Sequence, residues 1–398
     1  MNKKQHNILV ITYWQFQDAL VQTYTLPYLK LISKEISEDS KIFLLTLDKK
    51  EVPDNEIGTN IKNISFPLHP FGLRSMFNWI KIILKLLILI RKEKITTIHA
   101  WCTPAGMIGY ILSVLTGKRL IIDSYEPHAE AMVENGTWKK NSIAFKLLFY
   151  FEKKQTRRAA FLIAASEGMK EYAQKKYGHT KNNFFIKPAC VDLQLFSEKN
   201  IKNKSLLDQL QLHNKITCVY AGKFGGIYLK QDVFDFFKVA HDFWGDRFRV
   251  LILSSHTSDE IKDMAMKANL NEKVIIHKFV KHQDVPDYMG LADFAITPVK
   301  SVETKKYCTP IKDGEYWALG LPVVITQNIS DDSDIIEKNN IGYVLKVLNN
   351  SEYMKAVNVL DQLIQHTPKT ELYEKIRAIA SQRRNFRIAK EIYQIVYH

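Results

Sequence analysis

The segment from Cys308 to Val324 carries residues whose types and spacing suit the binding of a phosphorylated ligand. Thr309 is a good N-cap and Pro310 suits the first helical turn, so the sequence predicts a helix that begins here. A helix N-terminus presents free N–H groups and the positive end of the dipole, which together bind phosphate. Glu315 follows one to two turns later, where its carboxylate can accept hydrogen bonds from a ribose diol. The alternative is an ordinary capped helix in which Glu315 only balances the dipole.

A glycine-rich turn follows the predicted strand 216–220. Gly222, Gly225 and Gly226 surround Lys223, and Lys230 lies a few residues further on. By themselves these glycines are a weak signal. Only as part of a larger pattern would they indicate a loop whose backbone approaches a phosphate closely.

A third group of polar residues follows the predicted strand 119–123. Glu126 and His128 come directly after this strand, at the edge where α/β sheets place their ligands. We expect Glu126 and Asp123, the last residue of the strand, to contact a substrate hydroxyl. A histidine with a purely structural role is the alternative for His128.

Short apolar strands alternate with helices through both halves of the chain, which predicts parallel sheets covered by helices on both faces. The expected strands are 8–12, 41–46, 61–65, 97–101, 119–123 and 161–165, then 216–220, 249–253, 274–278, 294–297 and 323–326. The longest expected helices cover about 75–94 and 372–397. The polar segment 197–215 is interpreted as a linker between two domains.

The composition is that of a globular protein with a strong basic excess. Its 398 residues, 46% hydrophobic and 25% charged, suit two or three domains. A net charge of +14 suggests an anionic partner, which can be nucleic acid, an acidic membrane or a phosphorylated small molecule. The cysteines at 102, 190, 218 and 308 match no metal-binding spacing, so we expect buried free thiols and a reducing compartment.

One apolar run, Trp79–Ile90, has the length and pattern of an amphipathic helix. It is too short to span a bilayer, which needs roughly 20 apolar residues. Lys81 and Lys85 are four residues apart and therefore share one helix face. The run is either a helix packed on the sheet or a helix that lies on an anionic membrane. A second stretch, 139–158, mixes aromatic and basic residues in the same way.

The segment around Glu315 closely resembles the donor-binding signature of retaining glycosyltransferases with the GT-B fold (group 1, similar to family 4). The match includes Thr309, Pro310, Lys312 and Glu315, and continues through Tyr316, Ala318, Gly320, Pro322 and Val323. In this family the glutamate holds the nucleotide ribose, and the residues before it line the diphosphate. Tyr307 stands where many members carry a further glutamate.

The resemblance covers most of the chain. Residues 185–196 look like the segment that ends the family's first domain, and residues 219–226 look like the first strand and loop of its second. By this resemblance Lys223 meets the donor diphosphate, with Lys230 as a second basic residue, and His128 faces the transferred sugar. Gln17 and Asp18, in the first loop, are expected to face the acceptor. His128, Glu126 and Lys223 are therefore the expected catalytic residues.

The resemblance implies two Rossmann-like domains that face each other across a cleft. Residues 1–197 would bind the acceptor and residues 198–379 the nucleotide sugar, with a final helix at about 380–398 packed back on the first domain. No essential metal is expected, because lysines and helix N-termini can stabilise a diphosphate leaving group. Asp332-Ser333-Asp334 resembles the metal motif of the other glycosyltransferase fold, but Asp334 and Glu337 have the spacing of a capping box and predict a helix start.

The predicted activity is retaining transfer of a sugar from a nucleotide sugar to a glycan or lipid-linked acceptor, in bacterial surface polysaccharide synthesis. We expect a cytoplasmic protein, peripheral at the inner face of the cytoplasmic membrane, with an anionic membrane surface as a partner. Two alternatives are a sugar-nucleotide epimerase of the same architecture and a basic nucleic-acid-binding protein. The second lacks basic–aromatic motifs with known readout spacing, so no nucleic-acid partner is expected.

Overall fold

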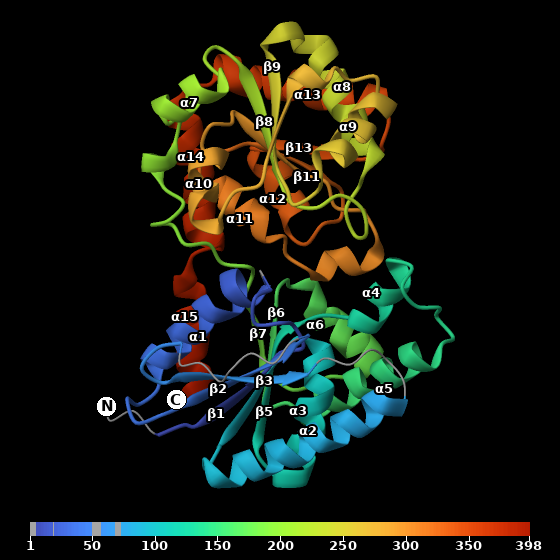
Figure 1. The fold of residues 1–398 in the computed structure, drawn as a ribbon, viewed down its shortest axis with the longest axis vertical. Helices are drawn as coiled ribbons and strands as arrows, with labels where there is room; N and C mark the ends of the chain where they lie inside the picture. The colour runs from blue at the N-terminus through green and yellow to red at the C-terminus, as the bar shows by residue number, and fades with distance from the viewer. Residues whose placement is uncertain (1–4, 19, 50–56, 68–72) are drawn as a thin grey trace. The chain divides into compact units, whose positions relative to one another are not determined.

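The chain folds into two compact units, each built on a parallel β-sheet (Figure 1). The structure, a computed structural model, describes residues 5–18, 20–49, 57–67 and 73–398, with the backbone only for 73–77. The first unit comprises Met1–Pro188 and Arg387–His398, and the second comprises Ala189–Phe386. The predicted fold class, two Rossmann-like doubly wound domains, is confirmed at the level of each unit.

The first unit contains a seven-stranded parallel sheet in the order β3-β2-β1-β4-β5-β6-β7. Its strands are β1 (Ile8–Ile11), β2 (Ile42–Asp48), β3 (Ile61–Pro67), β4 (Thr97–Trp101), β5 (Arg119–Tyr125), β6 (Phe161–Ala164) and β7 (Phe184–Ile186). All residues of β1, β2 and β4 are buried, because helices cover both faces of the sheet.

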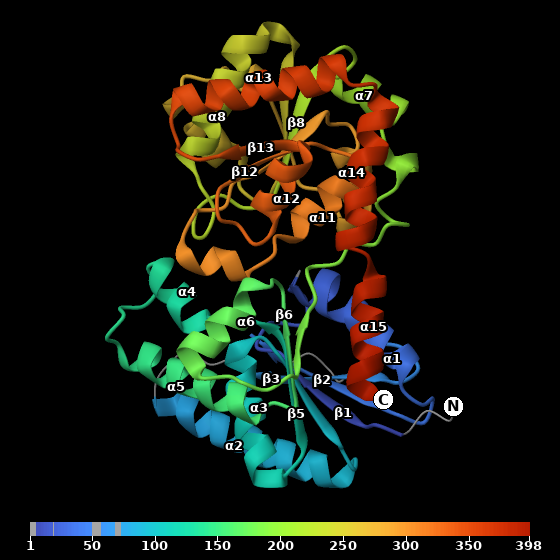
Figure 2. The same ribbon diagram turned by 180° about the vertical axis from the view of Figure 1, so that it is seen from behind.

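Helices lie on both faces of the first sheet, as Figures 1 and 2 show. One face carries α1 (Leu26–Glu35) and α15 (Phe386–Tyr397). The other carries α2 (Leu73–Lys92), α3 (Thr103–Thr116) and α5 (Ile143–Arg158). The shorter α4 (His128–Glu134) and α6 (Gly168–Tyr172) follow β5 and β6.

A buried polar cluster fastens α15 to the first sheet. Tyr393 of α15 donates its hydroxyl to Asp123 Oδ2 at 2.7 Å, and the Tyr397 hydroxyl lies 2.6 Å from His99 Nδ1. Asp123 also forms an ion pair with the buried Lys187 at 3.1 Å. The expectation that Asp123 contacts a substrate hydroxyl is wrong, because its side chain has no exposed surface and its oxygens are bonded inside the unit. Burial raises the pKa of Asp123, but Lys187 and the hydrogen bonds from His99 and Tyr393 outweigh it and hold the pKa at about 2.

The second unit contains a six-stranded parallel sheet in the order β10-β9-β8-β11-β12-β13. Its strands are β8 (Ile216–Ala221), β9 (Phe248–Leu253), β10 (Ile275–Lys278), β11 (Phe294–Thr297), β12 (Val323–Thr326) and β13 (Gly342–Leu345). Alternate residues along β8 join different cores: Cys218 and Tyr220 pack with one set of helices, and Val219 and Ala221 with another. This alternation produces a doubly wound sheet.

Two groups of helices cover the second sheet. One core includes α8 (Gln231–Trp244), α9 (Ser258–Lys267) and α13 (Asn350–His366). The other includes α7 (Lys204–Leu210), α10 (Val285–Met289), α11 (Ile311–Ala318), α12 (Asp332–Asn339) and α14 (Lys369–Arg383).

The boundary between the units differs from the predicted one. The prediction divided the chain after residue 197, whereas the structure divides it after Pro188. Val191 and Phe196 are buried in the second core, and Arg377 of α14 donates hydrogen bonds to the carbonyl oxygens of Leu193 and Phe196. These contacts place the segment in the second unit.

Two other expectations about segments are corrected. The polar segment 197–215 is no linker, because it contains α7 and buries Leu207 and Leu212 in the second core. The single helix expected at 372–397 is two helices, α14 and α15, which meet at Arg384. Arg384 is fully buried against Asp332 and cannot continue an exposed helical surface. The prediction also missed β7 and β13, which have only three and four residues.

Helix α2 has two apolar stripes. Ile82, Leu86 and Ile90 are buried against the first unit, whereas Ile80, Leu84 and Ile88 are 48%, 55% and 65% exposed. Among the helices that the described residues form, none has both the length and the apolar character needed to cross a membrane.

Three of the four cysteines are buried as free thiols, as predicted. Cys308 differs, because it is only partly buried.

Candidate active site

The candidate site of the second unit lies where the strand order changes direction, between β8 and β11. Connections after these two neighbouring strands leave in opposite directions, and ligands of open α/β sheets bind at this edge. The two connections also pair with each other. Leu229 N–H donates to Pro298 O at 2.8 Å, and Lys300 N–H donates to Ile227 O at 3.0 Å. Residues far apart in sequence are thereby held together at one edge.

The turn after β8 has the properties of an anion-binding loop. Gly225 and Gly226 have φ angles of 82° and 63°, which favour glycine. Within the described part of the chain, the N–H groups of Lys223, Gly225 and Gly226 donate to no protein acceptor. Lys223 is exposed and forms no ion pair with a described residue, and the same is true of Lys230. The turn therefore offers unpaired donors and positive charge together.

Gly222 follows the last residue of β8 and keeps the turn close to the sheet. Its N–H donates to Leu253 O at 3.0 Å. A Cβ atom at this position would lie 2.9 Å from the Tyr220 hydroxyl, so a side chain would displace that ring. The predicted glycine positions thus all have a physical reason.

Helix α11 begins one residue later than predicted. Pro310 is the N-cap, with an extended ψ of 124°, and Ile311 is the first helical residue. Thr309 does not cap the helix, because its hydroxyl lies 3.1 Å from the Ser330 hydroxyl. The expected helix N-terminus is therefore present without the expected threonine cap.

Lys312 and Glu315 form an ion pair in the first turns of α11. Lys312 Nζ lies 2.7 Å from Glu315 Oε2, and the two side chains are 36% and 6% exposed. The ammonium group fixes the orientation of a carboxylate that is largely withdrawn from water. Such a carboxylate can accept hydrogen bonds from ligand hydroxyl groups, while Lys312 retains donors for an anion.

Buried contacts hold α11 against the sheet. The Tyr316 hydroxyl accepts the N–H of Ala221 at 3.0 Å, and Asp313 accepts a hydrogen bond from Thr297 of β11. Burial and the neighbouring Asp332 carboxylate raise the pKa of Asp313. These contacts tie α11 to both strands that flank the change in strand order.

The segment Asp332-Ser333-Asp334 is a helix start, as predicted, but the predicted capping box is wrong. Asp332 is the first residue of α12 and pairs with Arg384. Asp334 pairs with Lys338 at 3.3 Å instead of capping the helix. No cluster of three metal-ligating side chains occurs among the residues that the structure describes.

In the first unit, Glu126 and His128 form a partly exposed pair after β5. His128 Nδ1 lies 2.8 Å from Glu126 Oε1, with side chains 16% and 27% exposed. His128 is the first residue of α4, and the Tyr13 ring lies edge-on to it at 6.1 Å. Tyr13 belongs to the loop after β1, so this loop and the β5 loop meet at one edge of the first sheet.

The two predicted acceptor residues lie in the loop after β1, which includes Ala19 outside the described residues. Gln17 is exposed. Asp18 is only partly exposed, and its Oδ1 accepts the N–H of Leu20 at 2.9 Å, at the start of the helical turn η1 (Leu20–Thr25). One oxygen of Asp18 is therefore used within the loop.

The structure adds Glu152, which the sequence analysis missed. Glu152 of α5 has no exposed surface; it accepts the N–H of Ala129 and the hydroxyl of Tyr177, both at 2.9 Å. Burial raises its pKa to about 7, and these hydrogen bonds and His128 partly oppose the shift. Glu152 thus fixes the first turn of α4, which carries His128.

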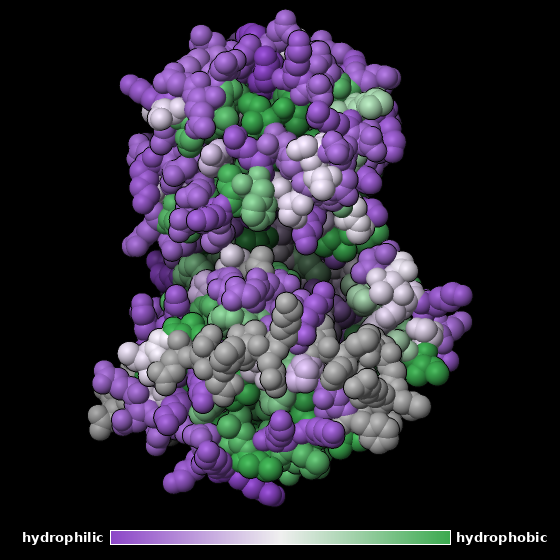
Figure 3. All heavy atoms as spheres, in the orientation of Figure 1, coloured by the Kyte–Doolittle hydropathy of each residue, from purple (hydrophilic) through white to green (hydrophobic). Residues whose placement is uncertain are grey.

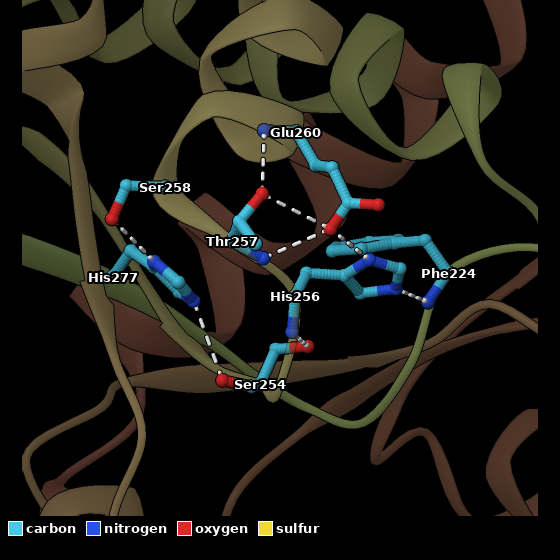
Figure 4. A network of polar contacts seen from close by, with 7 residues as sticks. All are labelled: Phe224, Ser254, His256, Thr257, Ser258, Glu260 and His277. Atoms are coloured by element: carbon cyan, nitrogen blue, oxygen red, sulfur yellow. Dashed lines mark hydrogen bonds and ion pairs between the residues drawn. The ribbon is translucent and has the colours of Figure 1, made fainter.

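His256 is a second missed residue, and it contacts the turn after β8 (Figure 4). Its Nε2 accepts the N–H of Phe224 at 3.0 Å. A sequence signal was available for His256, because it follows β9, the strand paired with β8. No such signal exists for Glu152, which lies in the middle of α5.

Comparison with known proteins gives the family of the second unit. The model of the family described as glycosyl transferases group 1 matches residues 194–383. The second unit belongs to the group 1 glycosyl transferases. The predicted enzyme class, a nucleotide-sugar-dependent glycosyltransferase, is confirmed at the level of this family. A search of curated proteins finds no match to this chain.

Solved structures with low sequence identity share the fold of this chain. Sucrose-phosphate synthase from Thermosynechococcus elongatus aligns with a TM-score of 0.75 and 14% identity, over 98% of each chain. HepE of Anabaena, in complex with UDP and glucose, aligns with a TM-score of 0.70 and 16% identity, over 98% of each chain. WaaG, a glycosyltransferase involved in lipopolysaccharide biosynthesis, aligns with a TM-score of 0.70 and 13% identity, over 98% of this chain and 99% of its own. These similarities confirm the GT-B fold.

Proposed function

We propose that this protein is a retaining glycosyltransferase that moves a sugar from a nucleotide sugar to a glycan or lipid-linked acceptor. One observation carries the proposal. In a group 1 domain, the edge of the sheet where the strand order changes combines unpaired N–H groups, exposed lysines and the Glu315 carboxylate. A nucleoside diphosphate needs these features: donors and cations for the phosphates, and an acceptor for the ribose hydroxyl groups.

Each donor-site residue has a role in this proposal. Gly222, Gly225 and Gly226 shape the turn that approaches the diphosphate, and Lys223 and Lys230 supply charge beside it. The start of α11, at Thr309 and Pro310, presents its N-terminus together with Lys312, and Glu315 binds the ribose. HepE is described as a complex with UDP and glucose, which supports UDP-sugars as the first donors to test.

Negative charge builds up on the diphosphate as the bond to the sugar breaks. Lys223, Lys312 and the α11 N-terminus would stabilise this charge without an essential metal. Retention by front-face attack lets a donor phosphate oxygen take the acceptor proton, so the reaction does not need a protein base. In this proposal His128 contacts the transferred sugar, oriented by Glu126 through the hydrogen bond at Nδ1, while Gln17 and Asp18 contact the acceptor.

We propose that the first unit works at an anionic membrane surface on the cytoplasmic side, where lipid-linked acceptors occur. The exposed stripe of Ile80, Leu84 and Ile88 on α2 runs beside Lys81 and Lys85, which are also exposed. Figure 3 shows apolar and hydrophilic side chains side by side over α2. Apolar residues flanked by lysines suit a surface of acyl chains and anionic headgroups.

Helices next to α2 extend this surface. On α3, Val114 and Leu115 are more than half exposed, and on α5 the same holds for Ile143 and Tyr150. Both helices belong to the face of the sheet that carries α2. The link of WaaG to lipopolysaccharide biosynthesis supports bacterial surface polysaccharide as the pathway class.

A panel of UDP- and GDP-linked sugars, with and without lipid extracts as acceptors, tests this function. The proposal predicts that one donor releases free nucleoside diphosphate only when an acceptor is present, and that the product keeps the anomeric configuration of the donor. Conversion of the donor sugar without nucleotide release would instead identify an epimerase. Salt-sensitive retention of DNA, with no binding of any nucleotide sugar, would identify a nucleic-acid-binding protein.

A further inference from the structure

The N–H group at the centre of the turn after β8 is already bonded. Phe224 lies between the residues whose N–H groups have no protein acceptor, yet its own N–H donates to His256 Nε2 at 3.0 Å (Figure 4). The two rings also lie in contact, with centroids 5.7 Å apart. His256 belongs to the loop between β9 and α9, so this contact joins two neighbouring loops at the same sheet edge.

The hydrogen bonds assign the tautomer of His256. A nitrogen that accepts a hydrogen bond carries no proton, so the ring proton is on Nδ1. Nδ1 lies 3.1 Å from Glu260 Oε2 and donates to it. Glu260 is itself held in a capping box, because it accepts the N–H of Thr257 at 2.9 Å. The neutral ring is therefore fixed at both nitrogens.

We infer that His256 is a positioning residue that holds the turn Gly222–Gly226 in the conformation that binds the donor diphosphate. This inference rests on the proposed function for the diphosphate. Two glycines in the left-handed region give the turn many alternative conformations, so the bound conformation needs a restraint. The bond to His256 supplies this restraint at the centre of the turn.

The packing of Phe224 and the hydrogen bond from the Tyr220 hydroxyl to the Lys223 carbonyl act together with the bond to His256 to order the turn. The Phe224 side chain is buried, with ring centroids 4.7 Å from Tyr220 and 5.2 Å from Phe234. With the side chain in the core and the N–H on His256, the backbone of residue 224 is fixed on both sides. The neighbouring N–H groups of Lys223 and Gly225 then remain available for a phosphate.

Three variants of the full-length protein test the inference. His256→Ala removes the acceptor, and His256→Gln replaces it, because the glutamine amide oxygen can accept the Phe224 N–H. His277→Ala is the matched control: this ring belongs to the same network, at 3.3 Å from Ser254 O and 3.4 Å from Ser258 Oγ, but no hydrogen bond joins it to the turn.

The measurements are hydrogen exchange at the Phe224 amide and the dissociation constants for UDP and GDP by calorimetry. We expect His256→Ala to speed exchange and to weaken binding of the preferred nucleotide, each at least tenfold. His256→Gln should restore most of both, and His277→Ala should match the wild type. Rescue by glutamine separates a specific hydrogen bond from a general loss of structure.

Two results would overturn the inference. Unchanged exchange at Phe224 in His256→Ala would show that the bond does not restrain the turn. Faster exchange with unchanged nucleotide affinity would show that the restraint does not serve the ligand. If the wild type binds neither UDP nor GDP while exchange responds as expected, the proposed function fails and the restraint on the turn is left without a diphosphate role.

Discussion

Lys223 differs from Lys238 and Lys312 of the second unit, because those two lysines pair with carboxylates and Lys223 does not. Lys238 pairs with Asp242 and Lys312 with Glu315, whereas Lys223 is exposed and has no acidic partner among the described residues. An unpaired ammonium beside an anion-binding turn is available to a ligand. For this reason Lys223 is assigned a catalytic role.

The substitution Lys223→Ala should lower kcat about 10- to 100-fold, because charge that develops on the leaving group loses a stabilising cation. Steady-state kinetics with the donor identified by the panel measure this effect. Lys238→Ala, which removes a partly exposed lysine on α8, should leave kcat unchanged. Normal turnover in Lys223→Ala would remove this residue from the mechanism.

Glu152 predicts a pH dependence of stability. Its pKa in the folded state is about 7, above the ordinary glutamate value, so the fold favours the protonated form. The stability that this group contributes is present below pH 4.5 and is lost as pH rises through 7. Glu152→Gln mimics the protonated form. As pH rises from 5 to 8, the free energy of unfolding of the variant should therefore increase relative to that of the wild type by up to about 3 kcal/mol.

Urea unfolding at several pH values measures this difference. His128 and Glu126 are titratable groups that also face Glu152, so the same titration in Glu126→Gln separates their contribution. Glu171→Gln, on the exposed surface of α6, is the control and should show no pH-dependent gain. A constant difference between Glu152→Gln and the wild type across this range would contradict the shifted pKa.

Sequence patterns identified site residues that lie in local motifs and missed those that depend on the fold. Lys312 and Glu315 lie in one helix turn, and Glu126 and His128 lie two residues apart. Their closeness in sequence is therefore enough to place the two members of each pair near each other in the fold. Asp123 was misjudged because its partners, Lys187 and Tyr393, come from distant segments. Strand pairing and the packing of α15 decide its burial, and neither is visible in a local pattern.

At the scale of elements, α2 combines the two interpretations that the sequence left open. One stripe of the helix packs into the first unit through Ile82, Leu86 and Ile90, and the opposite side exposes a second apolar stripe. The periodicity of the run predicted an amphipathic helix but could not tell which apolar residues are buried. That distinction comes from the neighbouring helix α3 and the sheet.

Charge reversal on α2 tests the membrane surface. Lys81→Glu with Lys85→Glu should weaken binding to phosphatidylglycerol vesicles at least tenfold at low salt, because each basic residue near the surface contributes about 1 kcal/mol. Sedimentation with vesicles measures the binding. Lys267→Glu with Lys273→Glu changes the charge equally on the second unit and should have little effect. Equal vesicle binding by the α2 variant and the wild type would exclude this face.

Element boundaries followed the sequence where strong local signals exist. β4, β11 and β12 begin and end where predicted, since each is a short apolar strand between polar residues. The last two helices were merged because the break at Arg384 has no proline or glycine. Its cause is the buried contact with Asp332, which only the folded unit supplies.

At the scale of the whole molecule, the basic excess has two proposed partners. Lysines at the edge of the second sheet are assigned to a diphosphate, and those on α2 to anionic lipid. Composition alone could not divide the charge between them, because a net charge of +14 does not show where the basic residues lie in the fold. The division depends on the two units, each with its own sheet and its own proposed site.

We propose that the second unit binds a nucleoside diphosphate through the start of α11. Calorimetry of the full-length protein with UDP and GDP, in the wild type and in Glu315→Ala, tests it most directly. We predict one-to-one binding of one nucleotide and a 10- to 100-fold loss in Glu315→Ala, because hydrogen bonds to a carboxylate contribute about 1.5–3 kcal/mol. Asp334→Ala on α12 should bind like the wild type. Absence of binding by the wild type, or equal affinity in Glu315→Ala, would contradict the account.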